Sequence, residues 1–144
     1  MMDKRLIIAI IVLFVLWFLG SGVVHGGFLH DDYAQLPNLF RPDSDMSQYF
    51  GWMLLAHLMT SVALVWIYSR GVTTRPWFGQ GMRFGCAIAF LTVIPTYTIF
   101  YVVQPMPGVM VIKQCIFDGI LMVLLSLVVA FLYRTHSSTT RSDA

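Results

Sequence analysis

Four long apolar segments dominate the chain and restrict its fold more than any other feature. A membrane-spanning helix needs about 20 predominantly apolar residues, and each segment is long enough to cross a bilayer. We therefore expect an all-α protein, an integral membrane four-helix bundle that forms a single domain over residues 1–134. The expected helices cover residues 6–24, 48–68, 79–103 and 108–133.

The composition indicates the same class of protein. Hydrophobic residues make up 58% of the chain and charged residues only 11%, which is unlike a soluble domain. The formal net charge is only +2, and the basic residues stand at the ends of the apolar segments rather than in one run. Nucleic acid is therefore not an expected partner, and the lipid bilayer is.

Local signals refine the limits of the expected helices. Asp45 is followed three residues later by Gln48, a spacing that caps the free amides of a starting helix and places a helix start near Met46. Pro105 and Pro107 cannot continue a helix, so they predict a tight hairpin between the third and fourth segments.

The distribution of charge predicts which helix ends share a side of the membrane. Acidic residues gather in the connection at 26–45, whereas basic residues occupy the other three ends, and basic connections stay in the cytoplasm. We expect up-down-up-down topology with both termini cytoplasmic. We expect residues 26–45 to form a periplasmic loop that can contain a short surface helix. We expect residues 135–144 to form a disordered cytoplasmic tail. The basic residues concerned are Lys4, Arg5, Arg70, Arg75, Arg83, Arg134 and Arg141.

Polar side chains within the apolar segments predict a site inside the membrane. Asp118 lies about ten residues, or about 15 Å, from the outer end of the fourth segment, and His57 lies at nearly the same depth in the second. An ionisable group at that depth is costly and indicates function by default. We expect a ligand or proton site that opens outward between these two residues. Its further members are Ser61, Thr96, Tyr97, Lys113 and Gln114.

Structural roles for the same residues stay open. Asp118 paired with Lys113 or His57 would lock the bundle, because polar side chains also join membrane helices. Lys113 is close enough to the outer end of its segment to extend its amine to the surface. A contact with another membrane subunit is the third interpretation.

The stretch GSGVVHGGFLHDDY at residues 20–33 suggests a metal site, because imidazole and carboxylate suit zinc or copper. Two histidines five residues apart point about 140° apart on a continuous helix, so they share an ion only where the glycines break the helix. In the alternative interpretation Gly22 and Gly26 pack against a neighbouring helix, as Gly81, Gly85 and Ala89 do in the third segment. The candidate ligands are His25, His30, Asp31 and Asp32.

Several motifs carry a resemblance to known proteins. They are the exit of the first segment and the runs Arg83-Phe-Gly, Pro95-Thr-Tyr, Val102-Val-Gln-Pro-Met-Pro-Gly, Lys113-Gln and Phe117-Asp-Gly. With the four-segment plan, the chain resembles a group of small four-helix bacterial inner-membrane proteins of unassigned activity. The resemblance implies a multi-pass protein of the bacterial inner membrane and transfers no catalytic residue and no cofactor.

These patterns favour binding over catalysis. No nucleophile, base and orienting group stand at a recognisable spacing, so we do not expect an enzyme. We expect a non-enzymatic binding or transport unit, homo-oligomeric, in which Asp118 and His57 take up a proton, a cation or a small cationic solute. The alternatives are an accessory or structural subunit of a larger membrane complex, and a metal-handling protein. No cofactor is expected beyond that metal ion.

Overall fold

The regular secondary structure of the chain is helical. The computed structural model describes residues 4–134, so the tail predicted at 135–144 lies outside the described residues. Within this range there is no strand, and the prediction of an all-α fold is confirmed. A turn of π-helix, Val24–Phe28, continues the first helix. The α-helices are α1 (Lys4–Val23), α2 (His30–Ala34), α3 (Asp43–Arg70), α4 (Trp77–Val103) and α5 (Gly108–Leu132).

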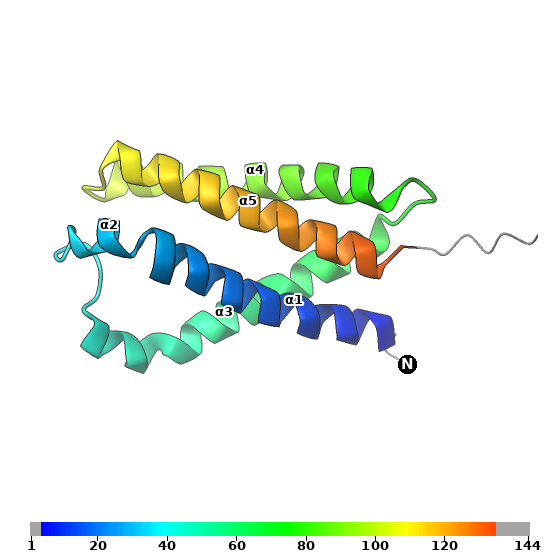
Figure 1. Ribbon diagram of the computed structural model, residues 1–144, viewed down its shortest axis with the longest axis horizontal. Coiled ribbons are helices and arrows are strands. Elements are labelled where there is room, and N and C mark those ends of the chain that lie inside the picture. The colour runs from blue at the N-terminus through cyan, green and yellow to red at the C-terminus, as the bar shows by residue number, and fades with distance from the viewer. Residues whose placement is uncertain (1–3, 135–144) are drawn as a thin grey trace, which may run out of the picture.

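Consecutive long helices run in opposite directions along the molecule (Figure 1). The helices α4 and α5 form a hairpin, α1 packs against α5, and α3 crosses α1. The short helix α2 lies at the same end as the turn between α4 and α5, and we call this end the α2 end. The start of α1, the end of α5 and the α3–α4 connection lie at the other end, the terminal end.

Within residues 4–134, four helices are long and apolar enough to cross a membrane. The candidate spans are Lys4–Phe28, Ser44–Arg70, Trp77–Val103 and Gly108–Leu132. Large apolar side chains cover much of their outer surface, and Phe90 is 72% exposed. Monomeric soluble proteins rarely expose apolar surface on this scale, so the exterior is compatible with contact to lipid.

Close backbone contact holds α4 against α5. A Cβ atom added to Gly85 would lie 2.8 Å from the Cα atom of Val123, and one added to Gly81 would lie 2.8 Å from the Cβ atom of Ala130. Ala89 continues the same buried stripe. The prediction of close packing along this series is therefore confirmed, because only small residues leave room for the neighbouring helix.

The other glycine prediction is wrong. Nothing lies within 4 Å of a Cβ atom added to Gly22 or Gly26, so neither glycine permits a close approach of helices. At Gly20 the situation differs, because a Cβ atom there would lie 2.5 Å from the Cδ1 atom of Leu121 on α5. The glycine of α1 that a side chain of α5 contacts is therefore Gly20, two residues before Gly22.

The predicted start of the second long helix also needs correction. The helix α3 begins at Asp43 and not near Met46, and its N-cap is Pro42. The Pro42 carbonyl accepts hydrogen bonds from the amides of Asp45 and Met46, at 2.9 and 3.3 Å. Proline has a fixed φ that suits the start of a helix, which explains why the helix begins before the expected cap.

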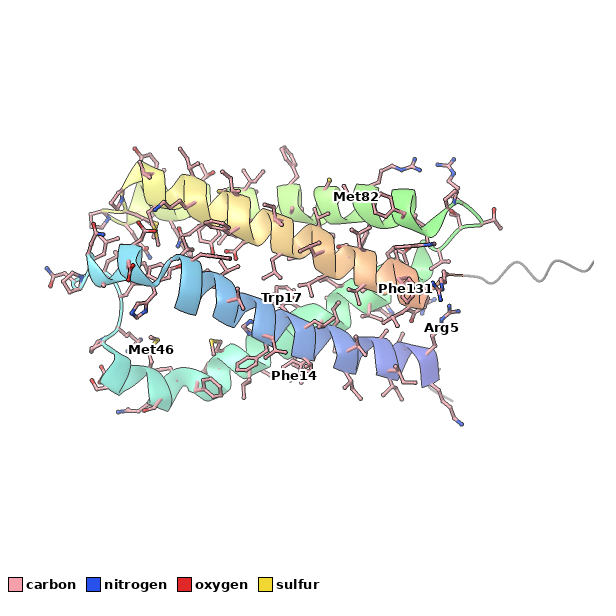
Figure 2. The ribbon with its side chains drawn as sticks, viewed as in Figure 1. Arg5, Phe14, Trp17, Met46, Met82 and Phe131 are labelled. Carbon is pink, nitrogen blue, oxygen red and sulfur yellow. The ribbon has the colours of Figure 1, made fainter. Side chains whose placement is uncertain are left out.

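At the terminal end, the side chain of Arg5 joins α1 to the end of α5. The Nε and Nη2 atoms of Arg5 donate to the carbonyl oxygens of Leu132 and Arg134, at 2.8 and 2.9 Å. Figure 2 shows Arg5 beside this end of α5, with Met46 at the opposite end of the molecule. A guanidinium at a helix C-terminus is favourable, because it satisfies carbonyls that have no partner within the helix.

Candidate functional site

Asp118 on α5 is the centre of a polar cluster that joins the π-helical turn, α4 and α5. It lies ten residues beyond the start of α5, about 15 Å along the helix axis. The hydroxyl of Tyr97 on α4 donates to Asp118 Oδ2, and the Nε2 atom of His25 lies 3.3 Å from Asp118 Oδ1. The Asp118 side chain is only 15% exposed. Two side chains from other helices thus hold one carboxylate in a largely buried position.

The π-helical turn brings His25 to this carboxylate. The amide of Leu29 donates to the carbonyl of Val24 at 2.9 Å, which closes the wide turn around Gly26 and Gly27. The glycines therefore widen the helix instead of breaking it. Turns of this kind are rare and occur often at functional sites, because they redirect side chains that an α-helix would place elsewhere.

A second hydrogen-bonded pair fixes the other side of the imidazole. The His25 Nδ1 atom lies 2.6 Å from the hydroxyl oxygen of Tyr33, and Gln114 Nε2 donates to the same oxygen at 3.3 Å. The rings of His25 and Tyr33 also stack, with centroids 5.9 Å apart. The short helix α2, which carries Tyr33, thus contacts both the π-helical turn and α5.

The Tyr33 hydroxyl connects the imidazole of His25 to α5. Its oxygen accepts a hydrogen bond from the side-chain amide of Gln114, and the His25 Nδ1 atom is its second partner. The opposite ring nitrogen of His25, Nε2, faces the Asp118 carboxylate. Burial raises the pKa of the Tyr33 phenol, with the charges of Asp118 and Asp32 adding to the effect, and the phenol keeps its proton at neutral pH.

Lys113 belongs to a separate ion pair at the α2 end. Its Nζ atom lies 2.8 and 2.7 Å from the two carboxylate oxygens of Asp32. The side chains are 42% and 28% exposed, so this pair contributes only about 0–1 kcal/mol to stability. It joins α2 to α5. Lys113 therefore pairs with Asp32, and not with Asp118 as one interpretation of the sequence suggested.

A cavity of about 410 Å³ lies beside Asp118, between the four long helices. This volume is within the range of sites that bind small molecules, about 300–1,000 Å³. The wall is mainly apolar and aromatic, with His25 and Asp118 on one side. The lining residues are Trp17, Ser21, His25, Ala56, His57, Thr60, Thr92, Val93, Thr96, Tyr97, Phe100, Asp118, Leu121, Met122 and Leu125.

The cavity opens between α3 and α4. Its wall residues Ala56 on α3 and Thr92 and Thr96 on α4 are exposed, whereas Val93 and Leu125 at its base are buried. Close packing joins α1 to α3 and α5, and α5 to α4, but it does not extend from α3 to α4 along this stretch. The opening of the cavity is therefore on the side of the helix bundle.

His57 lines this cavity without taking part in the hydrogen bonds of Asp118. Its Nδ1 atom lies 2.7 Å from the carbonyl oxygen of Met53, one turn earlier in α3. Its ring meets the rings of Trp17 and Phe18 edge to face, with centroids 5.7 and 6.2 Å apart. His25 has the place beside Asp118 that the sequence suggested for His57.

The remaining predicted site residues divide between wall and core. Thr96 borders the cavity, and its hydroxyl donates to the Thr92 carbonyl at 2.6 Å. Gln114 is buried behind Tyr33 and is not part of the wall, and Ser61 is buried in α3 outside the wall. Within residues 4–134, the Ser61 hydroxyl and the Gln114 carbonyl oxygen have no hydrogen-bond partner.

The four suggested metal ligands do not converge. His25 faces Asp118, and Asp32 faces Lys113, while His30 and Asp31 are exposed on α2. In the part of the chain that the structure describes, no three His, Cys, Asp or Glu side chains are grouped so as to hold a metal ion. The geometry therefore gives no support to the metal hypothesis.

Sequence reasoning missed the pairing of His25 with Asp118, although a signal for it was present. His25 follows Arg5 by 20 residues, and Asp118 precedes Arg134 by 16 residues. At 1.5 Å per residue, their heights above the basic ends are about 30 and 24 Å, a difference that side chains can span. Tyr33 had no comparable signal, because its place depends on how the chain turns after α1.

Comparison with known proteins gives no match. No protein-family model, no curated protein and no solved structure is similar to this chain.

Proposed function

We propose that this chain is a multi-pass protein of the bacterial inner membrane, with its terminal end in the cytoplasm and its α2 end in the periplasm. Basic side chains concentrate at the terminal end, where the positive-inside rule places the cytoplasm. The bacterial location follows from the resemblance described above. The residues that support the orientation are Lys4, Arg5, Arg70, Arg75, Arg83 and Arg134.

Within that membrane, we infer a non-enzymatic binding or transport unit that takes up a small solute in the cavity beside Asp118. One observation carries this inference: a largely buried carboxylate lines a cavity of about 410 Å³, with Tyr97 and His25 as its neighbours and no Lys or Arg side chain paired with it in the described residues. An ionisable group at membrane depth is costly, and such groups mark ion or substrate sites.

Binding is favoured over catalysis by the state of the hydroxyl that faces His25. An activated nucleophile needs a base beside it or a lowered pKa. Tyr33 does lie beside His25, but its pKa is raised, so it is a poor nucleophile at neutral pH. The polar cluster is therefore better suited to holding Asp118 in place than to covalent chemistry.

An accessory subunit of a larger complex is the second candidate. A shallow apolar groove of about 620 Å³ runs along the outer face of α4 and α5 and includes Cys86, Ala89 and Gly119. A Cβ atom added to Gly119 would meet nothing within 4 Å, so the backbone of α5 is accessible there to a partner helix. This groove lies outside the cavity of Asp118.

Native mass spectrometry of the protein, extracted gently from its own membrane, tests the first candidate against the second. We expect wild type to carry an additional small mass that is absent from Asp118→Asn and retained by Asp31→Asn, a matched change of an exposed carboxylate on α2. The asparagine keeps the shape of the side chain and removes its charge, so the loss reports on the site.

Three results would contradict the binding proposal. A fixed complex with a larger protein and no small mass would make the chain an accessory subunit. The same small mass on Asp118→Asn would place the ligand elsewhere. A zinc or copper mass that is lost in Asp31→Asn would instead support metal handling at the exit of α1.

A further inference from the structure

The charge of the cavity points to the kind of solute it accepts. Both carboxylate oxygens of Asp32 pair with the amine of Lys113, so that amine is engaged away from Asp118. No Lys or Arg is among the residues that line the cavity. Asp118 is the one carboxylate among these lining residues, and a monovalent cation is the ligand charge that complements it.

The wall does not suit an inorganic cation. Such ions need several oxygen ligands to replace their hydration shell. Apart from Asp118, the wall offers the hydroxyls of serine, threonine and tyrosine, and those of Thr60, Thr92 and Thr96 are directed at carbonyl oxygens of their own helices, at 2.6 to 2.8 Å. The described residues of the wall therefore do not supply the set of oxygen ligands that an inorganic cation needs.

Aromatic and apolar side chains make up the rest of the wall. The rings of Trp17, Tyr97 and Phe100 border the cavity, with Leu121 and Met122 beside them. Aromatic faces attract organic ammonium groups, and apolar side chains bind the hydrocarbon part of the same molecule. The carboxylate and the rings together are complementary to a molecule that has a cationic group attached to an apolar part.

The route of access agrees with this chemistry. The cavity opens between α3 and α4, beside the exposed Ala56 and Thr96. In a membrane this side of the bundle faces lipid. An amphipathic cation partitions to the lipid interface with its apolar body among the acyl chains, whereas a hydrated metal ion stays in water.

We propose that the cavity binds a monovalent organic cation that has an apolar body, with the cationic group at Asp118 and the body between Trp17 and Phe100. This inference rests on the proposed binding function and names its class of ligand.

Saturation binding of radiolabelled phenyltrimethylammonium to the protein in phosphatidylcholine nanodiscs tests the inference. We expect saturable binding that weakens about ten- to hundredfold in Asp118→Asn, because the negative charge that attracts the ammonium group is lost, and is unchanged in Asp31→Asn. Phe100→Leu keeps an apolar wall but removes a ring, and should weaken binding about two- to thirtyfold. Phe90→Leu changes an exposed ring on α4 outside the cavity and should have no effect.

Competition experiments show whether the cavity recognises the charge or the apolar part of the probe. Sodium ions and tert-butylbenzene, the uncharged isostere of the probe, should fail to displace it. Displacement by sodium would overturn the inference in favour of an inorganic cation, and displacement by tert-butylbenzene in favour of a merely apolar site. Equal binding to wild type and Asp118→Asn would overturn the role of the carboxylate, provided that both elute as the same species.

The failure of this inference is distinguishable from failure of the binding function. If the probe does not bind but native mass spectrometry finds a small mass lost in Asp118→Asn, the ligand class is wrong and the site stands. If neither is found, both proposals fall. Should Asp118→Asn not fold, the comparison of Phe100→Leu with Phe90→Leu still decides whether the probe occupies this cavity.

Discussion

Gly85→Val is expected to destabilise the protein by about 1–3 kcal/mol, the usual cost of overpacking a close contact. The added Cβ atom would lie 2.8 Å from the Cα atom of Val123 and 3.0 Å from the Cβ atom of Ser126. Because the nearest atom belongs to the backbone of α5, a rotamer change cannot relieve the clash, and the two helices must separate. Their separation would also displace Tyr97 from Asp118.

The measurement is reversible unfolding in mixed micelles of dodecylmaltoside and sodium dodecyl sulfate, followed by tryptophan fluorescence. Gly119→Val is the matched control in the same hairpin, because a Cβ atom there meets nothing within 4 Å. We expect the control to unfold like wild type within about 0.5 kcal/mol. Equal destabilisation by both changes would mean that helix propensity, and not the contact of α4 with α5, sets the effect.

Single cysteines should be labelled on opposite sides of the membrane. In a background in which Cys86 and Cys115 are replaced by alanine, Asn38→Cys lies at the α2 end and Thr74→Cys in the connection at the terminal end. A membrane-impermeant maleimide, applied to cells with a permeable outer membrane, should label the first variant almost completely and the second hardly at all. The reason is the positive-inside rule, which retains the basic terminal end in the cytoplasm.

Permeabilised cells provide the control, since both variants should then be labelled equally. Labelling of Thr74→Cys alone in intact cells would reverse the proposed orientation. Labelling of both variants in intact cells would be incompatible with a connection on each side of the bilayer.

The helices were predictable because each apolar segment contains the information for its own length. Pro105 and Pro107 end one helix and permit the next whatever the rest of the chain does. The start of α3 was less predictable, because two local signals compete there and Pro42 prevails over Asp45. The π-helical turn was not predictable, since the glycines of Val24–Phe28 allow a break, a continued helix or a widened turn.

The candidate site was predictable in part. Asp118 and Tyr97 stand out as polar residues in apolar segments, and the structure joins them by a hydrogen bond. Depth alone did not distinguish His25 from His57 as the imidazole beside Asp118, because depth contains no information about which face of a helix points inward. That choice depends on the packing of α1 against α5, where Gly20 meets Leu121.

The most direct test of this account is a solid-state NMR measurement of the dipolar coupling between the imidazole nitrogens and the carboxyl carbon of Asp118, in lipid bilayers. The account predicts a coupling to His25 Nε2, which lies 3.3 Å from the carboxylate oxygen. His57→Gln should leave this coupling unchanged, and His25→Gln should abolish it. A coupling that is instead lost in His57→Gln would contradict the account and return the site to the other histidine.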